Sequence, residues 1–170
     1  MKLESVDIIE QPLVKVYETV RDDLPLLVPY MPNVSKIVLE EKTGNKLVNR
    51  WFAIADVPSM LKKVIKPELF SWVDRATWDD DKRRVTYVLE STLGKSLYDA
   101  NGITEFRDLG DGRTELKVTC EVQLYPQNIP GVPKLLAKRL LPALESLMEK
   151  ILAPNLTALA GGLQKYYKQN

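Results

Sequence analysis

The chain has 170 residues, a net charge of +1 at neutral pH, 28% charged residues and 45% hydrophobic residues, as in an ordinary globular domain. This balance argues against binding of nucleic acid through a basic surface. Histidine is absent and Cys120 is the single cysteine, which excludes a disulfide within the chain, Ser-His-Asp and Cys-His catalytic sets, and zinc sites built from His or several Cys.

The chain is predicted to be an α+β domain in which short helices separate a first strand from a series of hairpins. Alternating polarity marks the strands, prolines shorten the early helices, and glycines mark the turns. The predicted elements are, in chain order, a strand at 3–10, a short helix from Pro12, one or two helical turns in 22–32, strands at 34–42 and 46–56, a short amphipathic helix in 57–70, strands at 70–79, 84–92, 96–109 and 113–126, and a helix from 133 onward.

The last strand and the last helix indicate how these elements pack. Strict alternation in 113–126 predicts a sheet with one dry and one wet face. The final helix carries a wide apolar face, and Pro142 and Pro154 can kink it. Because a one-sided sheet needs a cover, we expect this helix to lie across a curved antiparallel sheet of about seven strands.

Three stretches resemble the START/polyketide-cyclase superfamily, also called SRPBCC or helix-grip: KPELFSWVDRATWDDD (66–81), the 110–112 turn, and PGVPKLLAKRL (130–140). The order of elements extends the resemblance over nearly the whole chain, so residues 1–170 are expected to form a single START-like domain. The likeness is to bacterial members of unknown or lipid-related function, with a weaker similarity to PRELI-type lipid transfer proteins. It implies a cavity between sheet and helix that holds an apolar small molecule or lipid.

The alternation of the strands predicts which side chains face such a cavity. A ligand pocket has apolar walls and a few polar groups that point inward. A shift of one residue in a strand would turn its side chains to solvent, where Asp74 would pair with Arg50 or Arg75. The predicted ligand contacts are Asn49, Trp51, Trp72, Asp74, Tyr87, Asn101, Leu144, Met148 and Ile151.

Gly102 lies inside a predicted strand, which suggests a bulge or a bend. A bulge there would bring Asp99 and Asn101 to the cavity, whereas the alternative is that Gly102 only lets a long strand curl round the helix. The sequence contains no catalytic motif. Asp74, Asp99 and Tyr87 are the set that acid–base chemistry would have to use.

Residues 57–66 combine apolar side chains with a cluster of lysines. They could form a lid over the cavity, a transient contact with an anionic membrane, or an ordinary amphipathic helix on the sheet edge. Lys134, Lys138 and Arg139 could extend the same basic patch. The residues expected to form the lid or membrane contact are Met60, Leu61, Lys62, Lys63 and Ile65.

The sequence supports three functions, in this order. The first is binding, transport or sensing of a hydrophobic small molecule or lipid, the second a cyclase/dehydratase-like enzyme acting on a polyketide-like substrate, and the third a protein-interaction module. We expect no metal, no cofactor and no nucleic-acid partner. No apolar run is long enough to span a membrane, and MKLESVDIIE lacks the apolar core of a signal peptide, so mature sequence is expected. The single cysteine gives no sign of an oxidising compartment, so a cytoplasmic location is expected.

Overall fold

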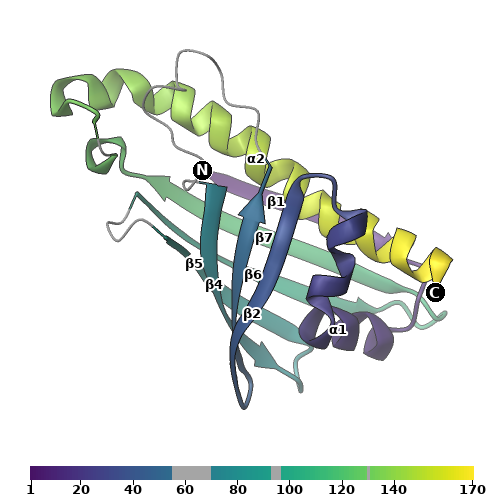
Figure 1. The fold of residues 1–170 in the computed structure, drawn as a ribbon. Coiled ribbons are helices and arrows are strands. Elements are labelled where there is room, and N and C mark those ends of the chain that lie inside the picture. The colour runs from purple at the N-terminus through teal and green to yellow at the C-terminus, as the bar shows by residue number, and fades with distance from the viewer. Residues whose placement is uncertain (55–69, 93–96, 130) are drawn as a thin grey trace.

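Seven strands form one antiparallel sheet, and a long helix lies across one face of it (Figure 1). The computed structural model describes residues 1–54, 70–92, 97–129 and 131–170. Its elements are β1 (Lys2–Ile9), α1 (Leu13–Asp22), η1 (Leu24–Tyr30), β2 (Val34–Thr43), β3 (Lys46–Ala53), β4 (Ser71–Asp79), β5 (Arg84–Ser91), β6 (Tyr98–Asp108), β7 (Thr114–Leu124), η3 (Pro126–Asn128) and α2 (Lys134–Gln169). The expected architecture is confirmed.

The strand order is β1-β7-β6-β5-β4-β3-β2, so β1 and β2 form the two edges. Strands β2 to β7 follow one another along the chain and pair with their sequence neighbours, as expected for consecutive hairpins. β1 instead pairs with β7. Helices α1 and η1 carry the chain from one edge of the sheet to the other, which explains why they separate the first strand from the hairpins.

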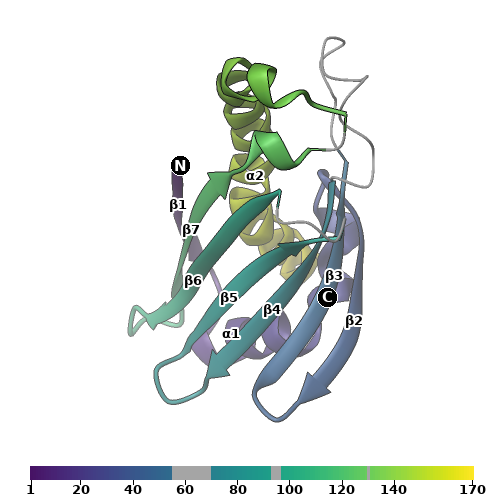
Figure 2. The same cartoon turned by 90° about the vertical axis from the view of Figure 1, so that its left-hand side faces the viewer.

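Burial alternates along the strands, so one face of the sheet is dry. On β7, the buried residues are Leu116, Val118, Cys120 and Val122. Glu121 and Gln123, which alternate with them, are exposed. The predicted dry face is therefore confirmed. Figure 2 shows α2 lying against the sheet, with its N-terminal part extending beyond the ends of the strands.

Helix α2 spans 36 residues and contains both Pro142 and Pro154 without ending at either. Its C-terminal half is fixed to the first part of the chain, since Gln164 Nε2 donates a 2.9 Å hydrogen bond to the Ile8 carbonyl. A Cβ added at Gly162 would lie 3.1 Å from Met31 Cγ, so the glycine permits close approach of η1. The wide apolar face is used to hold the early helices as well as the sheet.

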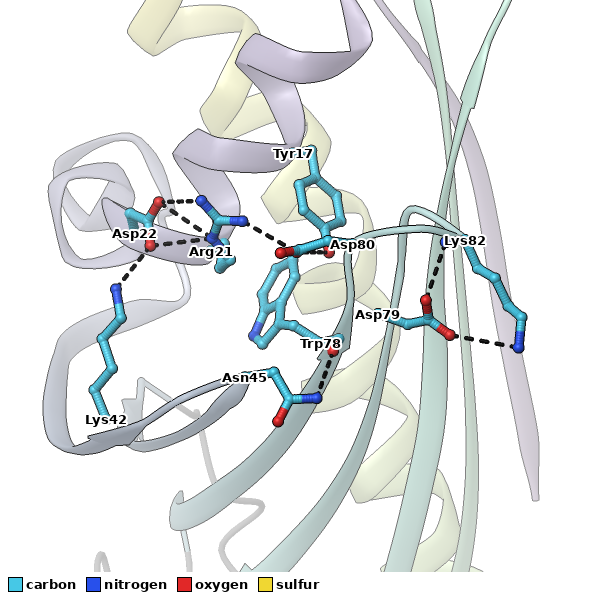
Figure 3. Close-up of polar contacts among 9 residues, drawn as sticks. All are labelled: Tyr17, Arg21, Asp22, Lys42, Asn45, Trp78, Asp79, Asp80 and Lys82. Carbon is cyan, nitrogen blue, oxygen red and sulfur yellow. Dashed lines mark hydrogen bonds and ion pairs between the residues drawn. The ribbon is translucent and has the colours of Figure 1, made fainter.

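A polar cluster fixes α1 to the turn between β4 and β5 (Figure 3). The Tyr17 hydroxyl donates a 2.8 Å hydrogen bond to Asp80, and Arg21 Nη1 lies 3.1 Å from the same carboxylate. Asp22 in turn accepts hydrogen bonds from Arg21 and Lys42. This cluster joins α1 to two hairpins.

Of the two alternatives for Gly102, the structure contradicts the bulge. Pairing of β6 runs without interruption past Gly102, which lies opposite Tyr87 on β5 and Cys120 on β7. The register shifts of the sheet lie instead in β2, between Val34 and Lys36 and between Leu39 and Glu41. Glycine is required at position 102 because the Tyr87 side chain passes directly over it.

Candidate ligand cavity

A cavity of about 120 Å³ lies between the dry face of the sheet and α2. The core divides into two clusters of buried side chains, and Trp51, Tyr87 and Leu156 contact both of them. The cavity occupies the junction between the clusters. It is lined by Val20, Leu24, Asn49, Trp51, Trp72, Asp74, Ala76, Trp78, Val85, Tyr87, Leu89, Thr104, Val118, Cys120, Leu152, Asn155, Leu156 and Leu159.

Aromatic side chains form much of the wall. Trp51 and Trp72 are opposite one another on β3 and β4, and their rings stack at 5.8 Å with an interplanar angle of 13°. Trp78 lies further along β4 and contacts the Tyr17 ring edge-on at 5.1 Å. These are the three tryptophans of the chain, and all of them line the cavity.

The polar groups in the cavity are few, and several have no partner. Asp74 Oδ1, Trp51 Nε1 and both side-chain polar atoms of Asn155 are buried and make no hydrogen bond within the part of the chain that the structure describes. Asn49, the cross-strand neighbour of Asp74, is also buried and lines the same space. A buried polar group without a partner costs free energy, so these atoms have an unused capacity to bind a guest.

Asp74 is the ionisable group with the most unusual surroundings in this cavity. Burial among aromatic and aliphatic side chains raises the pKa of Asp74 to about 7, and the nearby indole N–H of Trp51 offsets only part of this effect. Burial raises the pKa of Cys120 to about 11 and lifts that of Tyr87 well above its usual range. Near neutral pH, Asp74 therefore exchanges between its protonated and ionised forms, while Tyr87 and Cys120 stay uncharged.

Tyr87 spans the neighbouring strand. Its hydroxyl donates a 2.7 Å hydrogen bond to the Thr119 carbonyl on β7, although Tyr87 is on β5 and β6 lies between them. The ring can take this path because Gly102 has no side chain. A Cβ there would lie 2.4 Å from Tyr87 Cζ and 2.1 Å from the Thr119 carbonyl oxygen. The ring thus forms a fixed part of the cavity floor.

The sheet residues expected in the cavity have the expected orientation. Asn49, Trp51, Trp72, Asp74 and Tyr87 all line it, because the strand register is the one that the alternation predicted. Their contact with a ligand stays a prediction.

On α2 the expected lining residues lie too near the start of the helix. Leu144 and Met148 line a second space of about 40 Å³, and Met148 also lines a third of about 20 Å³. The side chain of Ile151 is not among those that the structure describes. Residues 57–66 also lie outside the described ranges, and with them the expected lid or membrane contact of Met60, Leu61, Lys62, Lys63 and Ile65.

The expectation that Asp99 and Asn101 line the cavity is wrong. Both are exposed on the wet face, because Tyr98, Ala100 and Gly102 hold the inward positions of β6. Asp99 Oδ2 accepts a 2.6 Å hydrogen bond from Tyr125 on this outer side. The two-carboxylate arrangement of Asp74 and Asp99 therefore does not exist in this fold.

Sequence reasoning missed the part of α2 that does line the cavity. Leu152, Asn155, Leu156 and Leu159 do so, at the i, i+3, i+4, i+7 spacing of one helical face. Asn155 is the polar residue of that set. Asn155, a single amide within an apolar stripe of the helix, is the one sequence signal for this part of the wall. Which turn of the helix faces the cavity depends on packing, which the sequence pattern does not specify.

The described residues contain no group of three or more His, Cys, Asp or Glu side chains placed to hold a metal ion. Nor does any helix among them have the length and apolar character needed to cross a membrane.

No protein-family model matches the chain, and no curated protein matches its sequence. Solved structures do match over its whole length. TTHA0849 from Thermus thermophilus is 18% identical with a TM-score of 0.68, covering 98% of this chain and 99% of that one. The Zhui aromatase/cyclase from a Streptomyces species is 19% identical with a TM-score of 0.70, covering 98% and 95%.

A third match is norcoclaurine synthase from Thalictrum flavum, which is 12% identical with a TM-score of 0.61 and covers 100% of this chain and 87% of that one. These neighbours are members of the SRPBCC, or helix-grip, group. At such low identities the likeness concerns the fold and not the activity. The seven-stranded antiparallel sheet, the short helices after β1 and the 36-residue terminal helix, together with these matches, show that the chain has the helix-grip fold.

Proposed function

We propose that this protein binds an apolar small molecule with at least one polar group in the cavity beneath α2, as a carrier or sensor of that molecule. The observation that carries the proposal is the combination of an apolar, aromatic wall with polar atoms of Asp74 and Asn155 that have no partner among the described residues. A guest with matching polar groups would satisfy these atoms while its apolar surface leaves water.

The size of the space indicates the size of the guest. The cavity of about 120 Å³ is comparable to an engineered apolar cavity of about 150 Å³ that accepts benzene. One ring therefore fits without rearrangement. Trp72, Leu89 and Leu152 line both this cavity and the third space, so a longer apolar chain would have to displace these shared side chains to extend toward Met148.

Native mass spectrometry of the purified protein tests this proposal. We expect a non-covalent adduct that is lost in Ala76→Phe, because Ala76 is buried in the cavity wall and a phenyl ring would fill the space. The matched control is Val88→Phe on the neighbouring strand, since Val88 is 49% exposed on the opposite face. An adduct that persists in Ala76→Phe, or no adduct and no binding across a lipid and small-aromatic panel, would contradict the proposal.

A second candidate is an enzyme of the cyclase or dehydratase class acting on a polyketide-like substrate. Asp74 favours it, since a carboxyl with a pKa of about 7 in a largely apolar cavity suits general acid–base chemistry, and Tyr87 lies near it. The similarity to an aromatase/cyclase supports the same candidate. Incubation with a linear polyketide mimic would test it. Turnover by the unaltered protein that Asp74→Asn abolishes is the expected result, with binding retained.

Transient membrane contact is a third element of the proposal, and the start of α2 supports it. Leu135 is 92% exposed and Leu136 44% exposed, between Lys134 and Lys138, which are also exposed. Exposed leucines among lysines suit the interface of an anionic bilayer. A carrier that collects or delivers an apolar guest would use such a contact, and a protein partner at the same surface is the alternative.

A further inference from the structure

We propose that the ligand of this cavity carries a cationic amine, which the Asp74 carboxylate and the surrounding aromatic rings bind together. The inference rests on the proposed function and names the chemical class of the guest. It starts from the fact that Asp74 Oδ1 is buried and has no hydrogen-bond partner among the described residues.

The first argument is the composition of the wall around Asp74. Trp51 and Trp72 stack on one another beside it, and Trp78 and Tyr87 line the same cavity. The face of an aromatic ring carries partial negative charge and attracts a cation within about 6 Å of its centre. Four rings and one carboxylate around a single small space form the kind of surroundings in which proteins bind ammonium groups.

The second argument is charge balance. No Lys or Arg is among the described residues that line the cavity, so Asp74 has no internal counter-ion there. Its ionisable neighbours are Tyr87 on β5 and Cys120 on β7, which stay uncharged at neutral pH because burial raises the pKa of both. The described lining residues from α1, η1, β3, β6 and α2 are not titratable. An anionic guest such as a fatty acid would meet an uncompensated carboxylate.

The third argument concerns what each guest would offer Asp74. A neutral alcohol can donate one hydrogen bond to the carboxylate, whereas an ammonium group has three N–H donors and adds the attraction between opposite charges. Asn155, whose side-chain oxygen is also buried without a partner among the described residues, lies on the facing helix and can accept a second N–H. The amine therefore satisfies more of the unpartnered atoms than a neutral guest of the same size.

Isothermal titration calorimetry tests the inference with three probes that share a phenyl ring on a short alkyl chain and differ in charge. They are 2-phenylethylamine as the cation, 2-phenylethanol as the neutral analogue and 3-phenylpropionate as the anion. At pH 8 we expect the unaltered protein to bind the amine at least about tenfold more tightly than the alcohol, and the anion most weakly. Asp74→Asn should remove the preference for the amine. Asp99→Asn, an exposed carboxylate on the outer face, is the matched control and should retain it.

The pH dependence gives an independent readout. With the pKa of Asp74 at about 7, the ionised fraction falls from most of the protein at pH 8 to a few per cent at pH 5.5. Affinity for the amine should therefore fall over that range, by up to about thirtyfold if only the ionised form binds it, while affinity for the alcohol should change little or rise.

The outcomes separate this inference from the proposed function. Equal or tighter binding of the alcohol by the unaltered protein at pH 8 would overturn the amine inference and leave a ligand-binding cavity. The same holds if Asp74→Asn keeps the preference for the amine. Binding of none of the three probes would contradict the amine inference and the proposed function together.

Discussion

The Tyr87 ring lies over Gly102, and its hydroxyl reaches the Thr119 carbonyl one strand further away. Three strands of the sheet are joined at this point by one side chain. The contact also fixes the ring as part of the cavity floor, because any side chain at position 102 would occupy its place. Stability and cavity shape therefore depend on the same pair of residues.

Gly102→Ala should destabilise the fold by about 3 kcal/mol. The added Cβ would meet the Thr119 carbonyl oxygen at 2.1 Å and the Tyr87 ring at 2.4 Å, so backbone or ring must move. Denaturant unfolding measures the change. Asn101→Ala is the neighbouring control, because Asn101 is exposed, and should alter stability by less than about 0.5 kcal/mol. Equal effects of the two substitutions would disprove the role assigned to Gly102.

Asp74→Asn should make the protein more stable at pH 8 than the unaltered protein, by an amount on the order of 3 kcal/mol. Burial raises the pKa of Asp74 to about 7, so the folded state holds its proton more tightly than the unfolded chain does. This group therefore favours unfolding as pH rises from about 4 to above 7, and imposes no penalty below about 4.

Thermal melts of both proteins between pH 4 and pH 8 measure this difference. The gain from Asp74→Asn should be small at pH 4 and largest at pH 8. A gain that is constant with pH would mean that Asp74 titrates normally in the folded protein.

Asp80→Ala should cost about 1–2 kcal/mol of stability, since Asp80 accepts hydrogen bonds from Tyr17 and Arg21 of α1. The hydrogen bond from Tyr17 holds the pKa of Asp80 below its usual range. Its contribution is therefore present above pH 4 and disappears as pH falls below the folded-state pKa. Asp81→Ala, an exposed carboxylate next in the chain, is the control and should have little effect in urea unfolding at pH 7.

Leu135→Asp should weaken sedimentation of the protein with vesicles that contain phosphatidylserine. The substitution places a negative charge at the most exposed leucine of α2, between two lysines. Leu26→Asp is the control, since Leu26 is 53% exposed but lies on η1 against the C-terminal half of α2. Sedimentation that is equally strong for both variants, or absent for the unaltered protein, would argue against membrane contact through α2.

Local patterns were enough to predict the architecture and much of the cavity wall. Alternation in β3, β4 and β5 predicts the inward direction of Asn49, Asp74 and Tyr87, because the period of a strand is set by its own backbone. The turns at Gly44 and Gly110, both with positive φ, hold their hairpins in register. One long apolar helix after one-sided strands then leaves few ways to cover the sheet.

Errors arose where the outcome depends on contacts between distant parts of the chain. From its own strand, Gly102 suggests either a bend or bulge or a strand that curls, and neither alternative includes the Tyr87 side chain, which comes from the next strand and passes over the glycine. The cavity meets α2 at Leu152 and Asn155 and not at Leu144, because the position of the helix along the sheet is set by η1 and β1. A periodic apolar helix does not contain that information.

Quenching of tryptophan fluorescence by a brominated guest tests the central claim most directly, since all three tryptophans line the cavity. With 4-bromobenzyl alcohol as the probe, we expect saturable loss of most of the emission from the unaltered protein. The Ala76→Phe variant should show only the weak, linear quenching of collisions in bulk water. Linear quenching in both proteins would contradict the account, because it would mean that no guest enters the space beneath α2.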